Sequence, residues 1–134
     1  MRAGLSEAEA SFVRWERVAR LATVDPQGAP HVVPICPVLD GDRLIFVSEA
    51  NAKIQNLRAN PRCAVVFDEY VEDWNLLRQV QIRGTATIVE EGSEWERGKA
   101  LLDEKYPQYE PVFPIRSGSL MVFLAVERVT SDGF

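Results

Sequence analysis

The sequence is poor in the residues that bind transition metals. It contains one histidine and two cysteines in 134 residues, and no Cys-x-x-Cys pair. A zinc site takes three or four such ligands, so no zinc centre is predicted. The acidic stretch from Asp68 to Asp73 lacks the glycine and the spacing of a calcium loop, and we expect a solvated turn there. A Ser-His-Asp or Cys-His catalytic group could use only His31, which lies in a proline-rich apolar segment, so such a group is disfavoured.

Long apolar runs and an excess of positive charge are also missing. No stretch approaches the roughly 18 consecutive apolar residues of a membrane span. The first residues lack the apolar core of a signal peptide, so a cytoplasmic protein without a membrane partner is the expectation. The net charge is -5, and basic clusters such as residues 14–17 are interrupted by acids, which argues against nucleic acid as a partner.

The composition is that of an ordinary globular protein. Hydrophobic residues make up 46% and charged residues 26% of the chain, without repeats or a dividing linker. We therefore expect one domain over residues 1–134 with a hydrophobic core of its own. Cys36 and Cys63 each lie inside an apolar run, and we expect buried thiols rather than a disulfide.

The first half of the chain alternates between helix and strand signals. Ser6 to Glu9 has the capping-box pattern, and four residues then recur at helical spacing: Ala8, Phe12, Trp15 and Ala19. A short strand over 21–24 and a turn over 25–28 follow. A further strand is expected over 30–39. Its prolines at 30, 34 and 37 lack amide donors, so it must be bulged, irregular or at a sheet edge.

The second half predicts more strands than helices. A turn at 40–42 leads to a strand over 43–47, a short helix that Pro61 stops, and a strand over 63–70. Residues 77–90 alternate, with Val80 and Ile82 on one face and Gln79, Gln81 and Arg83 on the other. A helix over 93–106, an extended connection over 107–114 and a strand over 119–130 complete the chain. This is a mainly β protein with short helices (α+β), and its six strands suggest a closed or nearly closed antiparallel barrel.

The junction from Ser48 to Lys53 combines a predicted helix N-terminus, small polar side chains and one lysine. Exposed amides and the helix dipole favour an anion at such a junction, and the lysine adds a full charge. A solvated amphipathic helix with ordinary surface charges explains the same residues. Arg83 has two similar explanations, as an anion contact or as a salt-bridge partner in an acidic protein. These residues alone leave both alternatives open.

Several segments in order carry a family resemblance. Residues 20–34, the following Gly-Asp turn and the series Lys53…Asn56-Leu57…Asn60-Pro61-Arg62 resemble the pyridoxamine-phosphate-oxidase-like split barrels, which bind flavins and deazaflavins. The segments 68–74 and 105–109 are similar to the branch of coenzyme F420-dependent enzymes. The resemblance covers about residues 10 to 130 and implies a six-stranded antiparallel split β-barrel of the FMN-binding type.

The resemblance also implies a homodimer with cofactor sites at the subunit interface. Lys53 would hold the cofactor phosphate, with Ser48 and Asn51 as hydrogen-bonding neighbours and Asn56 as a buried brace for the helix. Two further groups would approach the ring. The proline-rich strand would supply His31, Val33, Pro34 and Ile35. The loop and strand near the dimer interface would supply Trp74, Arg78, Gln79 and Gln81 to the chain's own or the partner's cofactor.

The implied activity is hydride transfer to a small organic substrate, with F420 as the first choice of cofactor and FMN as the second. The proton donor is His31 or solvent, and no catalytic residue is identified. Asn51 and Gln55 stand where basic residues are usual, and Arg78-Gln79 replaces an aromatic pair. A polyanionic cofactor tail would therefore need Arg58, Arg62, Arg78 or a partner's residue. Two non-catalytic alternatives remain: a binder of a flavin or haem-like ligand, and a dimeric scaffold with a degenerate site.

Overall fold

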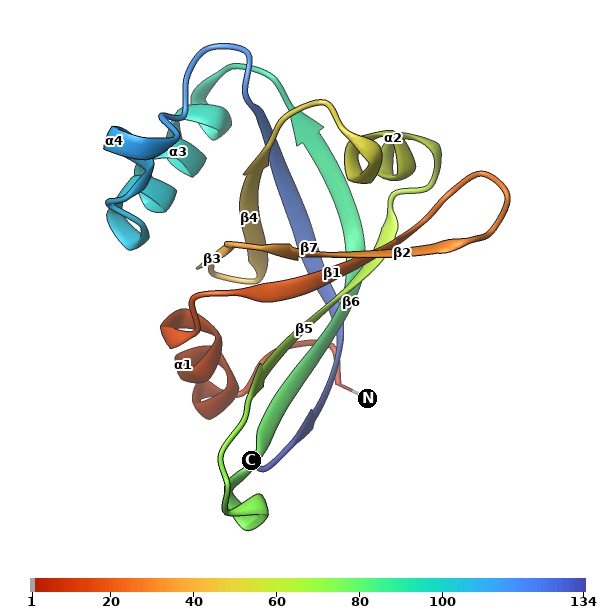
Figure 1. The fold of residues 1–134 in the computed structure, drawn as a ribbon, viewed down its shortest axis with the longest axis vertical. Helices are drawn as coiled ribbons and strands as arrows, with labels where there is room; N and C mark the ends of the chain where they lie inside the picture. The colour runs from red at the N-terminus through yellow and green to blue at the C-terminus, as the bar shows by residue number, and fades with distance from the viewer. Residues whose placement is uncertain (1) are drawn as a thin grey trace.

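A computed structural model describes residues 2–134, and its twelve elements form around one antiparallel sheet. The strand order is β2-β1-β5-β6-β7-β4-β3. Figure 1 shows this sheet curling into a half-barrel, with the long strands β5, β6 and β7 running along the molecule. In chain order the elements are α1 (Glu7–Trp15), β1 (Ala19–Val24), β2 (Pro30–Ile35), β3 (Val38–Asp40), β4 (Arg43–Ser48), α2 (Ala52–Ala59), β5 (Arg62–Glu69), the 3-10 helix η1 (Trp74–Leu76), β6 (Arg78–Val89), α3 (Ser93–Lys105), α4 (Tyr109–Val112) and β7 (Leu120–Asp132).

The sheet has seven strands rather than the expected six because the proline-rich segment forms two. It breaks at Cys36 and Pro37, so that β2 pairs with β1 at one edge of the sheet and β3 pairs with β4 at the other. An edge strand needs hydrogen bonds on one side only, and this is where missing proline donors are tolerated. The expected edge position is confirmed, and the expected single strand over 30–39 is wrong.

Three smaller expectations are also corrected. Trp15 ends α1 and is 83% exposed, because the buried face of that helix consists of Glu9, Phe12 and Val13 instead. Cys36 is exposed, and it lies in the break between two edge strands. Residues 109–112 form the short helix α4 within the connection that was expected to be extended. Both cysteines are free thiols.

Two clusters of buried side chains hold the fold together. The larger one fills the concave side of the curled sheet and includes Leu21, Phe46 and Phe67, all at most 1% exposed. The smaller one joins α3 to β4 and β7, and Trp95 donates from Nε1 to the carbonyl oxygen of Ser119 at 2.8 Å. Within residues 2–134, none of the helices is long and apolar enough to cross a membrane.

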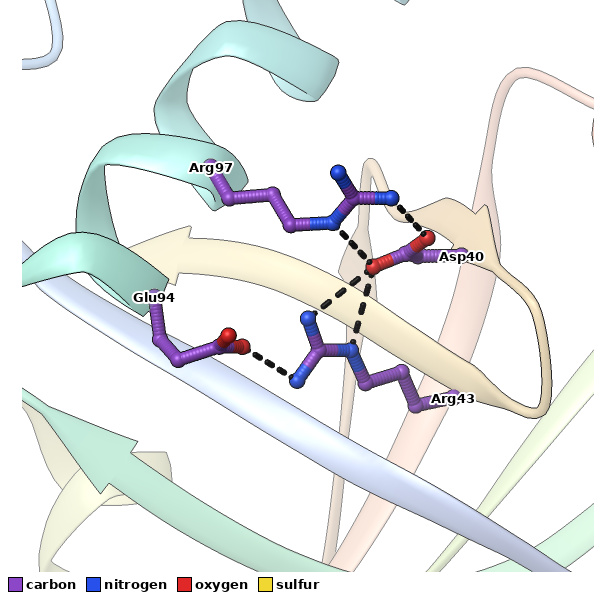
Figure 2. Close-up of polar contacts among 4 residues, drawn as sticks. All are labelled: Asp40, Arg43, Glu94 and Arg97. Carbon is purple, nitrogen blue, oxygen red and sulfur yellow. Dashed lines mark hydrogen bonds and ion pairs between the residues drawn. The ribbon is translucent and has the colours of Figure 1, made fainter.

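A network of four charged side chains fixes α3 to the β3–β4 hairpin (Figure 2). Arg97 of α3 donates from Nε and Nη2 to the two carboxylate oxygens of Asp40, at 2.9 and 2.8 Å. Arg43 donates to Asp40 from Nε and Nη2, at 3.2 and 3.0 Å, and its Nη1 lies 2.6 Å from Oε2 of Glu94. The hydrogen bond from Arg97 and the one from Arg43 outweigh burial and lower the pKa of Asp40 to about 2.

We expect the Asp40 network to stabilise the protein at neutral pH and to fail in acid. The pKa of Asp40 is lowered by folding, so its contribution is complete above the ordinary aspartate pKa and is lost as the pH falls towards about 2. The Asp40→Asn variant should be less stable by about 1–2 kcal/mol at pH 7. Urea unfolding of both proteins between pH 7 and pH 2 measures the difference, which should shrink below pH 4. Glu91→Gln, at an exposed carboxylate, is the control. A difference that stays constant with pH would contradict this role.

Candidate functional site

The junction between β4 and α2 lies at one end of the curled sheet (Figure 1). β4 ends at Ser48, opposite Leu120 of β7, and α2 begins four residues later with Asn51 as its N-cap. The Asn51 side chain does not cap the helix; its Oδ1 lies 3.5 Å from Oγ of Ser48, which also donates to the carbonyl oxygen of Glu49 at 2.8 Å. The first amides of α2 therefore have no side-chain acceptor, and they remain able to bind an anion.

Lys53 is the cation of this junction. Its side chain is half-buried, and its ammonium has no hydrogen-bond or ion-pair partner among residues 2–134. Burial lowers the pKa of Lys53 below the usual lysine value, because the charged form has lost part of its water. A partly desolvated and unpaired cation beside free helix amides fits a phosphate group, which would restore the missing partner.

A buried hydrogen bond fixes α2 onto the strand pair β1–β2. Asn56 is 6% exposed, and its Nδ2 donates to Oγ1 of the buried Thr23 at 3.0 Å. Thr23 lies directly opposite His31 in the β1–β2 register. The β4–α2 junction and the proline-rich strand are thus held together through Asn56 and Thr23, and His31 lies beside Thr23 on the neighbouring strand.

The two faces of β2 differ: one turns towards the core and the other is exposed. His31, Val33 and Ile35 share the face that turns towards the core, and Ile35 is 6% exposed. Pro34 and Val32 face the other way and are exposed, so Pro34 does not join the other three predicted ring contacts. Nδ1 of His31 is buried without a hydrogen-bond partner in the described chain. Such an atom is uncommon in folded proteins, and a ligand that bonds to it would account for it.

The other four predicted site residues lie far from the β4–α2 junction: Trp74, Arg78, Gln79 and Gln81. Arg78 begins β6, whereas the carbonyl oxygen of Pro61, just after α2, accepts from the amide of Ala86 eight residues further along β6. Eight residues of strand span roughly 26 Å. Figure 1 shows the same separation, with α2 at the upper end and the green segment after β5 at the lower end, near the C-terminus. One chain therefore forms two separate groups of predicted site residues.

Three of these four residues already have side-chain partners within the chain: Arg78, Gln79 and Gln81. Arg78 pairs with Glu69 at 2.6 Å, and its guanidinium lies 4.8 Å from the ring centre of Phe12 and 5.6 Å from that of Phe134. Trp74 is 72% exposed, which excludes a place in the core of this chain. The remaining two side chains bond to each other, with Nε2 of Gln81 3.1 Å from Oε1 of Gln79.

An apolar cleft just after β2 was missed from the sequence. Its volume is about 380 Å³, and it opens beside Cys36, the residue that follows the last residue of β2. The side chains around it come from the connection between α3 and α4, from α4 and from the residue after α4: Tyr106, Gln108, Tyr109, Val112 and Phe113. The segment Lys105 to Tyr109 had contributed to the family resemblance, but nothing in its pattern indicated a cavity.

The polar side chains near this cleft make hydrogen bonds to the backbone or have shifted pKa values. The hydroxyl oxygen of Tyr106 lies 2.9 Å from the carbonyl oxygens of Arg17 and Pro37. Nζ of Lys105 donates to the carbonyl oxygen of Pro37 at 2.9 Å, and burial lowers its pKa to about 8. Burial raises the pKa of Tyr109 to about 12, so its hydroxyl is neutral at physiological pH. Residues 2–134 contain no group of three or more histidine, cysteine or carboxylate side chains that could hold a metal ion.

Sequence comparison identifies the family. The model of the family described as pyridoxamine 5'-phosphate oxidase matches residues 5–131. The chain belongs to this family. A pyridoxine/pyridoxamine 5'-phosphate oxidase of Rhodopseudomonas palustris is 40% identical over 88 residues, which are 63% of this chain and 39% of that protein. The match thus spans about two-fifths of the length of such relatives. A 5a,11a-dehydrotetracycline/5a,11a-dehydrooxytetracycline reductase of Streptomyces rimosus is 32% identical over 98 residues, which are 69% of each protein.

Solved structures confirm the split-barrel fold. A conserved hypothetical protein of Mycobacterium tuberculosis is 28% identical, with a TM-score of 0.81 over 96% of this chain and 85% of that one. A haem storage protein of Vibrio cholerae is 22% identical, with a TM-score of 0.82 over 98% and 96% of the two chains. An F420 reductase is 21% identical, with a TM-score of 0.73 over 94% and 98%. The last two share the fold, and their identities are too low to carry a function.

Proposed function

We propose that this member of the family is a reductase that binds coenzyme F420, with FMN as the second choice of cofactor. The observation that carries the proposal is the unpaired, half-buried Lys53 beside the uncapped first turn of α2. A phosphate-bearing cofactor would supply the missing anion. When bound, the reduced ring would supply a hydride to a small organic substrate.

The relatives support reduction more than oxidation of a pyridoxamine phosphate. The relatives named as oxidases match this chain over 39% of their length, and the Streptomyces reductase matches over 69% of its length. The F420 reductase of known structure has the same fold. Reduction is therefore the better supported activity for this chain.

In this proposal the core-facing side of β2 lines the cofactor ring. Val33, which is half-buried, would provide an apolar contact, and His31 would use its buried Nδ1 to bond a polar edge of the ring, whereas Ile35 belongs to the hydrophobic core. Ile35 lies four residues beyond His31, roughly 13 Å along the strand. The ring would thus extend from the phosphate junction towards the apolar cleft beside Cys36, where an organic substrate could lie against Tyr109 and Phe113.

The proposal includes a homodimer. No helix covers the outer face of β2, β1 and β5 in the described chain. On this face Ala22 of β1 lies between Val32 of β2, which is 66% exposed, and Ala64 of β5. A second copy packed on this face would bury it. It would also offer a way to bring Trp74, Gln79 and Gln81 of one chain near the β2 strand of the other, which a single chain does not do.

Cofactor titration of the purified protein tests the proposal. The visible spectrum of the protein as purified comes first, since a bound flavin and a bound deazaflavin absorb differently. We expect fluorescence titration to give micromolar or tighter binding of F420, and reduced F420 to be consumed with a panel of reducible aromatic substrates. If neither F420 nor FMN binds at micromolar concentration, the redox proposal is wrong. Tight binding without turnover, or preferential binding of haem, would favour a non-catalytic ligand-binding protein.

A further inference from the structure

Within residues 2–134, the lining of the apolar cleft beside Cys36 contains three aromatic side chains and no charged one. The cleft has a volume of about 380 Å³. This is at the lower end of the range for small-molecule sites, and it fits a ligand of about two or three fused rings. Val112 and Phe113 are 59% and 76% exposed, so a flat apolar ligand would also remove their surface from water.

The cations next to this lining interact with Tyr106 and the backbone. Nζ of Lys105 donates to the carbonyl oxygen of Pro37 and lies 5.3 Å from the ring centre of Tyr106. The guanidinium carbon of Arg17 lies 4.6 Å from the same ring centre. Neither cation belongs to the side chains that line the cleft. A carboxylate or phosphate in the cleft would therefore lose its water without meeting an opposite charge in the lining.

Two lining side chains remain able to form hydrogen bonds with a ligand: Gln108 and Tyr109. Neither side chain has a hydrogen-bond partner within residues 2–134. Burial raises the pKa of Tyr109 to about 12, so its hydroxyl keeps its proton and can donate it in a hydrogen bond. The hydroxyl of Tyr106, in contrast, lies 2.9 Å from each of two backbone carbonyl oxygens. A ligand that offers an acceptor would satisfy the free hydroxyl of Tyr109.

The cleft is separate from the surface that the proposed second copy would cover. That surface is the outer face of β2, β1 and β5, and none of the six residues lining the cleft belongs to these strands. Covering that face does not require any of the lining side chains.

We propose that the cleft binds an uncharged, flat ring compound whose carbonyl oxygen accepts a hydrogen bond from Tyr109, and that it excludes carboxylates and phosphates. That this compound is the substrate of the reductase rests on the proposed function, whereas its binding to the cleft requires no cofactor. Tyr109 is then a specificity-determining residue. A phosphorylated pyridoxamine falls outside this class of ligand because of its charge.

The thiol of Cys36 reports whether the cleft is occupied. Cys36 is exposed at the edge of the cleft, whereas burial raises the pKa of the half-buried Cys63 to about 12. N-ethylmaleimide should therefore alkylate Cys36 much faster than Cys63. Mass spectrometry follows the rate at each thiol in the full chain without cofactor. Three naphthalenes, substituted at the same ring position, are titrated as protecting ligands: acetylnaphthalene, isopropenylnaphthalene and naphthoate.

The three ligands have nearly the same shape and differ in the acceptor and in charge. Acetylnaphthalene should protect Cys36, and isopropenylnaphthalene should need a roughly two- to tenfold higher concentration, because it lacks one hydrogen bond. Naphthoate should bind at least about tenfold more weakly than acetylnaphthalene, because its charge is desolvated without a partner. In Tyr109→Phe the difference between the two uncharged ligands should vanish. Tyr70→Phe, at a 63% exposed tyrosine outside the cleft, is the control.

Equal protection by acetylnaphthalene and naphthoate overturns the proposal, and so does a lack of protection by all three ligands. A folded Tyr109→Phe protein with the wild-type preference removes the role of Tyr109. The comparison of the three ligands on wild type decides the ligand class even if that variant does not fold. Protection of Cys36 in a protein that binds neither F420 nor FMN would retain the ligand class and remove only the redox role. Cofactor binding without protection would do the reverse.

Discussion

The Lys53→Ala variant is expected to bind the phosphate-bearing cofactor more weakly by about 1.5–3 kcal/mol, which corresponds to a dissociation constant roughly 10 to 150 times larger. This is the range for a hydrogen bond assisted by a full charge. Lys53 can contribute near the upper end because its ammonium is half-buried and has no competing partner in residues 2–134. Cofactor binding therefore does not have to break an existing ion pair of Lys53.

Fluorescence titration of wild type and variant with F420 and with FMN measures this change. Lys99→Ala is the matched control, because Nζ of Lys99 already pairs with Asp103 at 2.7 Å on the surface of α3. Its removal should leave cofactor binding unchanged. Lys53→Arg should recover part of the affinity, since it restores the charge with a different shape. An unchanged dissociation constant for Lys53→Ala would remove this residue from the site.

Local signals in the sequence were sufficient for most elements. Pro61 marks the end of α2, because proline cannot continue a helix, and the helix ends at Ala59. The alternation from Gln79 to Arg83 identifies the two faces of β6, and Val80 and Ile82 are fully buried. Ser6 and Glu9 form the capping box that their spacing predicts. In each case the signal and the structure that it determines lie within a few residues.

The candidate site depends on contacts between distant parts of the chain, and the sequence predicted these contacts less well. Asn56 and Thr23 are 33 residues apart, so only the folded sheet shows that their hydrogen bond joins α2 to β1. The break at Cys36 and Pro37 places β2 and β3 at opposite edges of the sheet. The three prolines indicate an edge position, but they do not indicate which edge each part of the segment occupies. The family resemblance named Lys53 and Trp74 as parts of one kind of site, but a single chain keeps them in separate groups.

Gly84 shows how a tertiary contact gives a residue a role that its local pattern does not reveal. In the sequence it is one small member of the face that includes Val80 and Ile82. In the fold it lies at the β-bulge, where the register between β6 and β7 shifts by one residue after Arg83. A Cβ atom at this position would lie 1.8 Å from the carbonyl oxygen of Ala125 and 2.8 Å from Cδ2 of Leu124. Only glycine allows the two strands to approach this closely.

We therefore expect Gly84→Ala to destabilise the protein by about 3 kcal/mol, at the upper end of the usual range for overpacking. The contacted atom belongs to the backbone of β7, so the clash cannot be relieved by rotating a side chain. The two central strands must separate at the bulge, and the hydrogen bonds around Thr85 must weaken. For a domain of this size the melting temperature should fall by roughly 10 °C. Thermal and urea unfolding, followed by circular dichroism, measure the change.

Two other glycines serve as matched controls for the Gly84 variant. A Cβ at Gly4 meets no atom within 4 Å, so Gly4→Ala should leave the melting temperature nearly unchanged. A Cβ at Gly98 would lie 2.8 Å from Cγ and Sδ of Met121, a flexible side chain that can move, so Gly98→Ala should cost less than Gly84→Ala. A Gly84→Ala protein as stable as the Gly4→Ala protein would show that the bulge adjusts without loss.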